Sequence, residues 1–202
     1  MRVLLATRNA KKLAELERIL AGSVELVGLD DVPPYPEAPE TGLTFEENAL
    51  LKAREAVRYT GLPSIADDSG LAVDALNGMP GVFSARWSGK HGDDLANLLL
   101  VLAQTGDVPA EHLGAAFVCV AAVVWPDGRE QTVRGEMRGR LVREPKGEGG
   151  FGYDPIFVAD GQDRTNAELT NAEKDAISHR GKAFRALAAL LASEPSQPSD
   201  RS

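Results

Sequence analysis

The stretch AAFVCVAAVVWPDGREQTVRGEM, residues 115–137, decides the fold class. Its first half is a long apolar run, and the triplet Pro126-Asp127-Gly128 then forms a turn before a second extended segment, so the stretch predicts a β-hairpin. Capping residues and helical spacing of leucines predict helices over 9–22, 44–61, 93–106 and 181–192. Further strands are predicted at 2–7, 24–28, 63–76, 139–144 and 155–158. Strands that interleave with helices in this way predict an α/β protein with a mixed sheet.

Length and charge narrow the class of protein. The 202 residues suffice for one domain, expected over 1–192, and the polar, Pro-bearing tail 193–202 is expected to be disordered. A net charge of −8 argues against a broad basic surface for nucleic acid or an anionic membrane. The sequence shows neither a signal peptide nor a membrane-spanning run, so we expect a cytoplasmic protein. The single cysteine, Cys119, is predicted to be buried and structural.

Two predicted helices begin with basic residues, although the positive end of a helix dipole favours acidic ones. Asn9 is a natural cap for the first of these helices, and Ser178 for the second. The basic residues are Lys11 and Lys12 in one helix and His179 and Arg180 in the other, with Thr7 and Lys174 nearby in sequence. We interpret both starts as sites for an anion such as phosphate. The alternative is that these are solvated surface charges and an incidental histidine.

Two adjacent carboxylates, Asp67 and Asp68, follow a short apolar run and precede a predicted Ser69-Gly70 turn. A polyphosphate needs a divalent cation, and Mg²⁺ takes oxygen ligands from one or two carboxylates. In an extended segment the two side chains point to opposite faces, so we expect one to bind metal while the other orients or deprotonates a water. The alternative is a local turn with two solvated aspartates. Further candidate metal ligands lie in or after the acidic, Pro-rich loop: Glu40, Glu37, Glu46 and Glu47.

The glycine-rich stretch GEGGFG, residues 147–152, matches the dinucleotide-binding pattern only formally. That motif must open a helix, whereas here Tyr153, Asp154 and a strand-like run follow. A loop that admits a flat ring fits better, with Phe151 and Tyr153 as stacking faces. Asp154 would either accept hydrogen bonds from the ligand or brace the loop. The alternative is a flexible turn whose aromatic side chains belong to the core.

Several motifs occur in an order that resembles a known family. They are TRNAKK, TGLTFEENALLKA, ADDSGLAVDAL, PGVFSARWSG, GGFGYDPIF and SHRGKAF, and they run from residue 2 to about 190. Together they resemble the inosine/xanthosine triphosphate pyrophosphatases. The resemblance implies a two-lobed α/β fold about a long mixed sheet, a homodimer, and Mg²⁺-dependent hydrolysis of ITP, dITP or XTP to the monophosphate and pyrophosphate.

The resemblance also implies roles for individual residues. Asp68 would be the proton acceptor and a metal ligand, with Asp67 beside it and Glu40 as the second metal ligand. Substrate would be bound by the turn from Thr7 through Arg8, Asn9, Ala10 and Lys11 to Lys12, by Ser69, by Phe151, Gly152, Tyr153 and Asp154, and by Lys174, His179 and Arg180. At Arg8 many relatives have glycine, and the arginine could either reach the phosphates or point to solvent.

Three rival functions remain open from the sequence. A related pyrophosphatase could act on modified pyrimidine or methylated nucleotides. A catalytically silent nucleotide-binding regulator would not need the Asp67-Asp68 pair or Lys12. A phosphopeptide- or nucleic-acid-binding module is disfavoured by the net charge of −8.

Overall fold

The fold is built on one mixed sheet. The computed structural model describes residues 2–20, 25–37 and 39–193, with only the backbone described for residues 10 and 11. Six strands lie in the order β2-β1-β3-β4-β5-β6. Their bounds are β1 Arg2–Leu5, β2 Glu25–Val27, β3 Ser64–Val73, β4 Gly114–Val124, β5 Glu130–Leu141 and β6 Phe157–Ala159. β1 pairs in parallel with β2 and β3, and the remaining pairs are antiparallel, as a mixed sheet requires.

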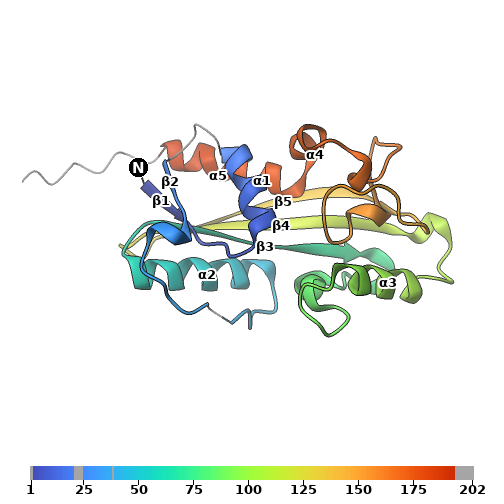
Figure 1. The fold of residues 1–202 in the computed structure, drawn as a ribbon, viewed down its shortest axis with the longest axis horizontal. Helices are drawn as coiled ribbons and strands as arrows, with labels where there is room; N and C mark the ends of the chain where they lie inside the picture. The colour runs from blue at the N-terminus through green and yellow to red at the C-terminus, as the bar shows by residue number, and fades with distance from the viewer. Residues whose placement is uncertain (1, 21–24, 38, 194–202) are drawn as a thin grey trace, which may run out of the picture.

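Helices cover both faces of this sheet (Figure 1). On one face lie α1 (Ala10–Leu20), α4 (Asn171–Ile177) and α5 (His179–Ser193), and on the other lie α2 (Phe45–Thr60) and α3 (Asp94–Gln104). Strands β3 to β5 run along the molecule, with α2 under one end and α3 under the other, which gives the predicted two lobes. Short 3₁₀ segments lie at Leu29–Asp31, Asp74–Leu76, Gly81–Arg86, Ala110–His112, Asp154–Ile156 and Asn166–Glu168.

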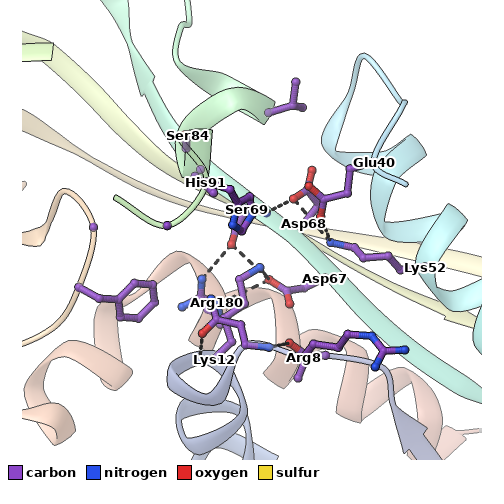
Figure 2. Close-up of a pocket in the computed structure, with 18 of the residues that line it drawn as sticks. Arg8, Lys12, Glu40, Lys52, Asp67, Asp68, Ser69, Ser84, His91 and Arg180 are labelled. Carbon is purple, nitrogen blue, oxygen red and sulfur yellow. Dashed lines mark hydrogen bonds and ion pairs between the residues drawn. The ribbon is translucent and has the colours of Figure 1, made fainter. Parts of the chain in front are cut away.

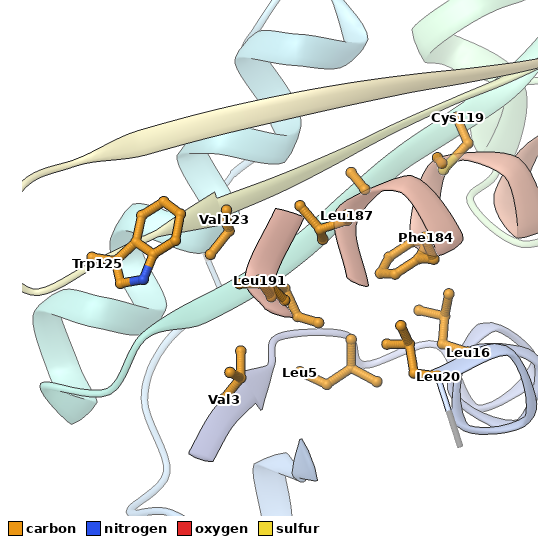
Figure 3. Close-up of a cluster of buried hydrophobic side chains, with 13 residues drawn as sticks. Val3, Leu5, Leu16, Leu20, Cys119, Val123, Trp125, Phe184, Leu187 and Leu191 are labelled. Atoms are coloured by element: carbon orange, nitrogen blue, oxygen red, sulfur yellow. The ribbon is translucent and has the colours of Figure 1, made fainter. Parts of the chain in front are cut away.

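Alternation along β3 divides the core between the two faces. Ile65 packs under α1 and α5, in the cluster drawn in Figure 3 with Leu16, Phe184 and Cys119. The next residue, Ala66, packs on the opposite face against α2. Successive strand residues point to opposite faces. Asp67 and Asp68 therefore continue the same alternation, and they approach different helices.

The predicted helix starts are confirmed at their caps. Asn9 Oδ1 accepts a hydrogen bond from the backbone N–H of Lys12 at 3.2 Å, and Ser178 Oγ accepts one from Gly181 at 2.9 Å. Thr44 and Glu47 form the predicted capping box of α2. Each cap involves residues within three positions of each other, so it can be predicted from the sequence alone.

Three details differ from the prediction. There is no turn at Ser69-Gly70, because β3 continues through both residues and pairs with β4 from Ser64↔Val124 to Val73↔Ala115. Gly70 serves close packing instead: a Cβ there would lie 2.3 Å from the Gly81 carbonyl oxygen. The strand predicted at 139–144 is the end of β5, and α4 was not predicted. Gly22 and the tail beyond residue 193 lie outside the described residues.

Within the described ranges 2–20, 25–37 and 39–193, the helices are too short or too polar to cross a membrane.

Candidate active site

A cavity of about 380 Å³ opens beside β3 where β1 ends. The pairing of β1 with β3 stops at Leu5↔Ile65, and the chain then turns away into α1. Most predicted site residues line the cavity: Thr7, Arg8, Asn9, Lys12, Glu40, Asp67, Asp68, Ser69, Phe151, Gly152, Tyr153, Asp154, Lys174, His179 and Arg180. Ala10 and Lys11 form the first turn of α1 beside it. Segments far apart in the chain thus meet around one cavity.

Asp67 lies in a cluster of buried ion pairs on the α1 and α5 face (Figure 2). Its carboxylate accepts hydrogen bonds from Lys12 Nζ at 2.9 Å and Ser69 Oγ at 3.2 Å, and Arg180 Nε lies 3.6 Å away. Burial by itself would raise the pKa of Asp67, but the charges of Lys12 and Arg180 outweigh it and hold the pKa well below its ordinary value. Asp67 is therefore a fixed negative charge that orders two cations.

Asp68 has a different environment on the α2 face. Asn48 Nδ2 donates to its carboxylate at 3.1 Å, and Lys52 Nζ lies 3.8 Å away. Burial raises the pKa of Asp68, and the charge of Lys52 only partly opposes this. A more basic carboxylate is a better proton acceptor near neutral pH. The two neighbouring aspartates thus differ in chemistry because they face different helices.

Glu40 lies on the same side of the cavity as Asp68. Lys52 Nζ donates to Glu40 Oε1 at 2.8 Å, and Arg86 Nη1 lies 3.3 Å from Oε2. Burial favours the neutral acid, but Lys52 outweighs it and lowers the pKa of Glu40. The competing acids have other roles: Glu47 caps α2, Glu46 lies 3.8 Å from an arginine of β5, and Glu37 lies 3.9 Å from Arg8.

The donor set fits Mg²⁺. Two carboxylates, of Glu40 and Asp68, converge on the single ammonium group of Lys52, so this position already accommodates a positive charge. Oxygen ligands from one or two carboxylates, completed by phosphate and water, are what Mg²⁺ takes in phosphate-binding sites. Among the described residues no group of three His, Cys, Asp or Glu side chains could hold a metal by itself. A ligand oxygen would therefore complete the coordination.

The other end of the cavity holds the glycine-rich loop. Asp154 accepts from the backbone N–H of Phe151 at 2.8 Å, from Lys174 Nζ at 2.7 Å and from Asn166 Nδ2 at 3.1 Å, so it braces the loop. Tyr153 packs in the core and donates its hydroxyl to the Ser84 carbonyl at 2.8 Å. The loop is thus tied on two sides, and the ring of Phe151 remains half-buried at the cavity.

The charge predicted for one of the basic residues, His179, is wrong. The prediction treated His179 as a cation, but burial, with Arg180 and Lys174 nearby, holds its pKa well below the ordinary value. The imidazole is neutral, stacks on Phe117 at 4.9 Å between ring centroids, and leaves Nδ1 buried without a hydrogen-bond partner among the described residues. Arg180 is already paired with Glu15. Protein carboxylates, not only an incoming anion, therefore offset the charges at the helix starts.

Lys52 and Glu15 were missed by the sequence analysis. Lys52 follows Asn48 by one helical turn, and both interrupt an otherwise alanine-rich buried face of α2. Glu15 lies three residues after Lys12 on α1, on the side that meets Arg180. Polar residues repeated at helical spacing on an apolar face were the signal that could have found Lys52.

The fold and the donor groups of this cavity fit a phosphorylated ligand together with a cation. A sequence model of the Ham1 family matches residues 3–190, and the chain belongs to this family. It is 67% identical to a dITP/XTP pyrophosphatase of Nocardia farcinica, over 95% of each chain. A crystal structure of a nucleoside-triphosphatase, or dITP/XTP pyrophosphatase, of Mycobacterium abscessus is 64% identical with a TM-score of 0.78, covering 95% of this chain and 99% of that one. A HAM1 protein of Coxiella burnetii has a TM-score of 0.87 at 41% identity, with coverage of 96% and 100%.

Proposed function

We propose that this protein is a hydrolase that converts the deaminated purine nucleotides ITP, dITP and XTP to their monophosphates and pyrophosphate, with Mg²⁺ as cofactor. The observation that carries the proposal is the single cavity that joins a braced ring-binding loop, a basic helix start and the Asp68–Glu40 pair. The dITP/XTP pyrophosphatase names of relatives at 60–67% identity support the choice of substrate.

The triphosphate would lie at the start of α1. The side chains of Thr7, Asn9 and Lys12 offer donors there, and the positive end of the helix dipole favours an anion. Lys12 is ordered by Asp67, and Arg180 by Glu15 and Asp67, so both cations are positioned before the substrate arrives. Positioned charges need little reorganisation as negative charge develops on the leaving group.

Asp68 would act as the proton acceptor. It takes a proton from a water whose oxygen attacks the α-phosphorus, while the bond from that phosphorus to the bridging oxygen breaks and pyrophosphate leaves. Asp68 and Glu40 would hold Mg²⁺. The chemistry that a bound Mg²⁺ supplies is positive charge against the phosphate oxygens.

The base would lie against Phe151. Lys174 Nζ and the Arg180 guanidinium lie 5.0 and 5.5 Å from the centre of that ring, and His179 Nδ1 has no hydrogen-bond partner among the described residues. Polar groups ready to pair with a 6-oxo group would be left unpaired by the 6-amino group of adenine, and a buried unpaired polar group is costly. This supports selection of hypoxanthine and xanthine over adenine.

A panel of nucleotides tests the proposal. We expect pyrophosphate release from ITP and XTP with Mg²⁺, no release with a chelator, and at least about 100-fold lower kcat/KM for ATP, as expected when a buried polar group is left unpaired at a cost of up to about 3 kcal/mol. GTP belongs in the same panel, because hypoxanthine lacks guanine's 2-amino group. Preferred release from dTTP or a methylated nucleotide would favour the related pyrophosphatase instead. Binding of ITP without release of pyrophosphate would favour the silent regulator.

Lys52→Met should shift the pH dependence of catalysis. Removing this ammonium group takes away a charge that opposes the burial-driven rise in the pKa of Asp68. The proton acceptor would stay protonated to a higher pH, so the acid limb of the kcat/KM profile should move up by about one pH unit. Lys90→Met, at a lysine with 81% of its side chain exposed, is the control. An unshifted acid limb in Lys52→Met would contradict the role given to Asp68.

We also propose that the enzyme acts in the cytoplasm as a homodimer, without a nucleic-acid or membrane partner. The net charge of −8 supports the lack of a nucleic-acid or membrane partner. Light scattering coupled to gel filtration measures the assembly.

A further inference from the structure

Arg8 lines the cavity together with Tyr35 and Glu37 of the loop that precedes α2. Figure 2 shows its guanidinium directed away from Lys12 and Asp67. It donates from Nη2 to the Tyr35 carbonyl oxygen at 2.5 Å, lies over the Tyr35 ring at 5.3 Å, and places Nε 3.9 Å from Glu37 Oε2. All three contacts join the turn after β1 to one short segment of the loop that precedes α2.

Tyr35 also has contacts with α2. Its ring stacks on Tyr59, near the end of α2, with centroids 5.5 Å apart and planes at 11°. It also packs against the α2-side core. Tyr35 therefore contacts both Arg8, which belongs to the phosphate-binding turn, and a helix that covers the α2 side of the sheet.

The same loop carries Glu40. Prolines at 33, 34, 36 and 39 lack backbone donors, so side-chain contacts must fix much of the course of this loop. Downstream, Glu40 is paired with Lys52, and Asn48 Oδ1 accepts from the backbone of Gly42 at 2.8 Å. Arg8 supplies the upstream attachment.

We propose that Arg8 is a positioning residue that fastens Tyr35 and Glu37 to the phosphate-binding turn and so holds Glu40, further along the same loop, in place for Mg²⁺. This inference rests on the proposed function, and it assigns Arg8 to the protein's own loop instead of to the triphosphate. The guanidinium can donate to a carbonyl and stack on an aromatic ring at once, which a lysine does poorly. The attachment is partly exposed, with 42% of the Arg8 side chain accessible, so its effect is moderate.

Hydrogen exchange on metal-free and nucleotide-free protein gives the first test. In Arg8→Ala, the hydrogen-bonded backbone amides of Thr41 and Gly42, directly after Glu40, should exchange about three- to tenfold faster than in the wild type, as expected for losing a partly exposed charged contact. The exchange rates of the same amides in Arg8→Lys should lie between those in Arg8→Ala and those in the wild type. Arg58→Ala is the matched control, because Arg58 lies over Tyr59 of the same aromatic pair at 5.7 Å and its ion pair is with Glu55 of its own helix.

Nucleotide and metal titrations distinguish a role of Arg8 in fastening the loop from a role in binding the triphosphate. For Arg8→Ala we expect the Mg²⁺ concentration for half-maximal activity to rise about three- to tenfold, with unchanged affinity for a non-hydrolysable ITP analogue in EDTA. Unchanged amide exchange together with weaker analogue binding in EDTA would overturn the proposal and return Arg8 to the triphosphate. If the wild type fails to hydrolyse ITP, the proposed function fails, whereas the exchange experiment still decides whether Arg8 orders this segment.

Discussion

Asp68→Asn is expected to lower kcat about 10²- to 10⁴-fold, the usual contribution of a positioned proton acceptor, with little change in melting temperature. Asparagine has nearly the same shape, and Asp68 has no ion pair shorter than 3.8 Å among the described residues. Because burial disfavours the charged carboxylate here, a neutral side chain is tolerated by the fold. Steady-state pyrophosphate release and thermal unfolding measure the two effects.

Asp74→Asn is the matched control for this substitution. Asp74 directly follows β3 and pairs with Arg138 at 2.6 Å, with about half of its side chain exposed, and it does not line the cavity. We expect normal turnover in this variant. An Asp68→Asn enzyme with wild-type turnover would refute the assignment of the proton acceptor.

Asp67→Asn, the same chemical change one residue earlier, is expected to destabilise the protein by about 3–5 kcal/mol. Removing one partner of a buried ion pair leaves the other charge uncompensated, and here both Lys12 and Arg180 lose their shared carboxylate. Urea unfolding at pH 7 measures the difference, with Asp68→Asn as the isosteric comparison. A loss under about 1 kcal/mol would mean that Asp67 does not hold these cations in place.

In the wild type, lowering the pH should remove the stabilisation that Asp67 provides. The folded pKa of Asp67 lies below its unfolded value of about 3.9, so its stabilisation is complete above that value and is lost as the pH falls below it. The unfolding free energy of Asp67→Asn should therefore decline less steeply than that of the wild type when the pH is lowered from 5 to 3. Parallel curves for the two proteins would argue against a lowered pKa.

What the sequence could predict was local. The caps at Asn9, Ser178 and Thr44 act within three residues along the chain, and the structure has them where the sequence placed them. The hairpin of β4 and β5 is joined by a short turn, so its two strands were also visible in the sequence. Candidate site residues such as Lys12 and Arg180 combined a chemical group with such a local signal, whereas Ser69 and Gly152 were named through the resemblance to a family.

What could not be predicted depended on partners distant in the chain. The Ser69-Gly70 pair resembles a turn locally, but pairing with β4, some 50 residues later, keeps it extended. The neutrality of His179 follows from burial and from Lys174 and Arg180 converging in space. In the same way the fixed charge of Asp67 and the basicity of Asp68 depend on which helix each residue faces.

The early end of β1 also bears on self-association. The edge of β3 is covered by β1 as far as Ile65, and from Leu71 onward it is covered by Ser84, whose Oγ accepts from the Leu71 N–H at 2.9 Å. The stretch between them borders the cavity, and because Ala66, Asp67 and Asp68 are almost fully buried there, a strand of another molecule cannot add to it to form aggregates. Within this gap the Asp68 carboxylate accepts a hydrogen bond from the Ser69 N–H at 3.0 Å, and Lys12 and Arg180 offset the charge of Asp67. The early end of β1 thus makes room for a cavity in the sheet without presenting an edge that another chain could extend.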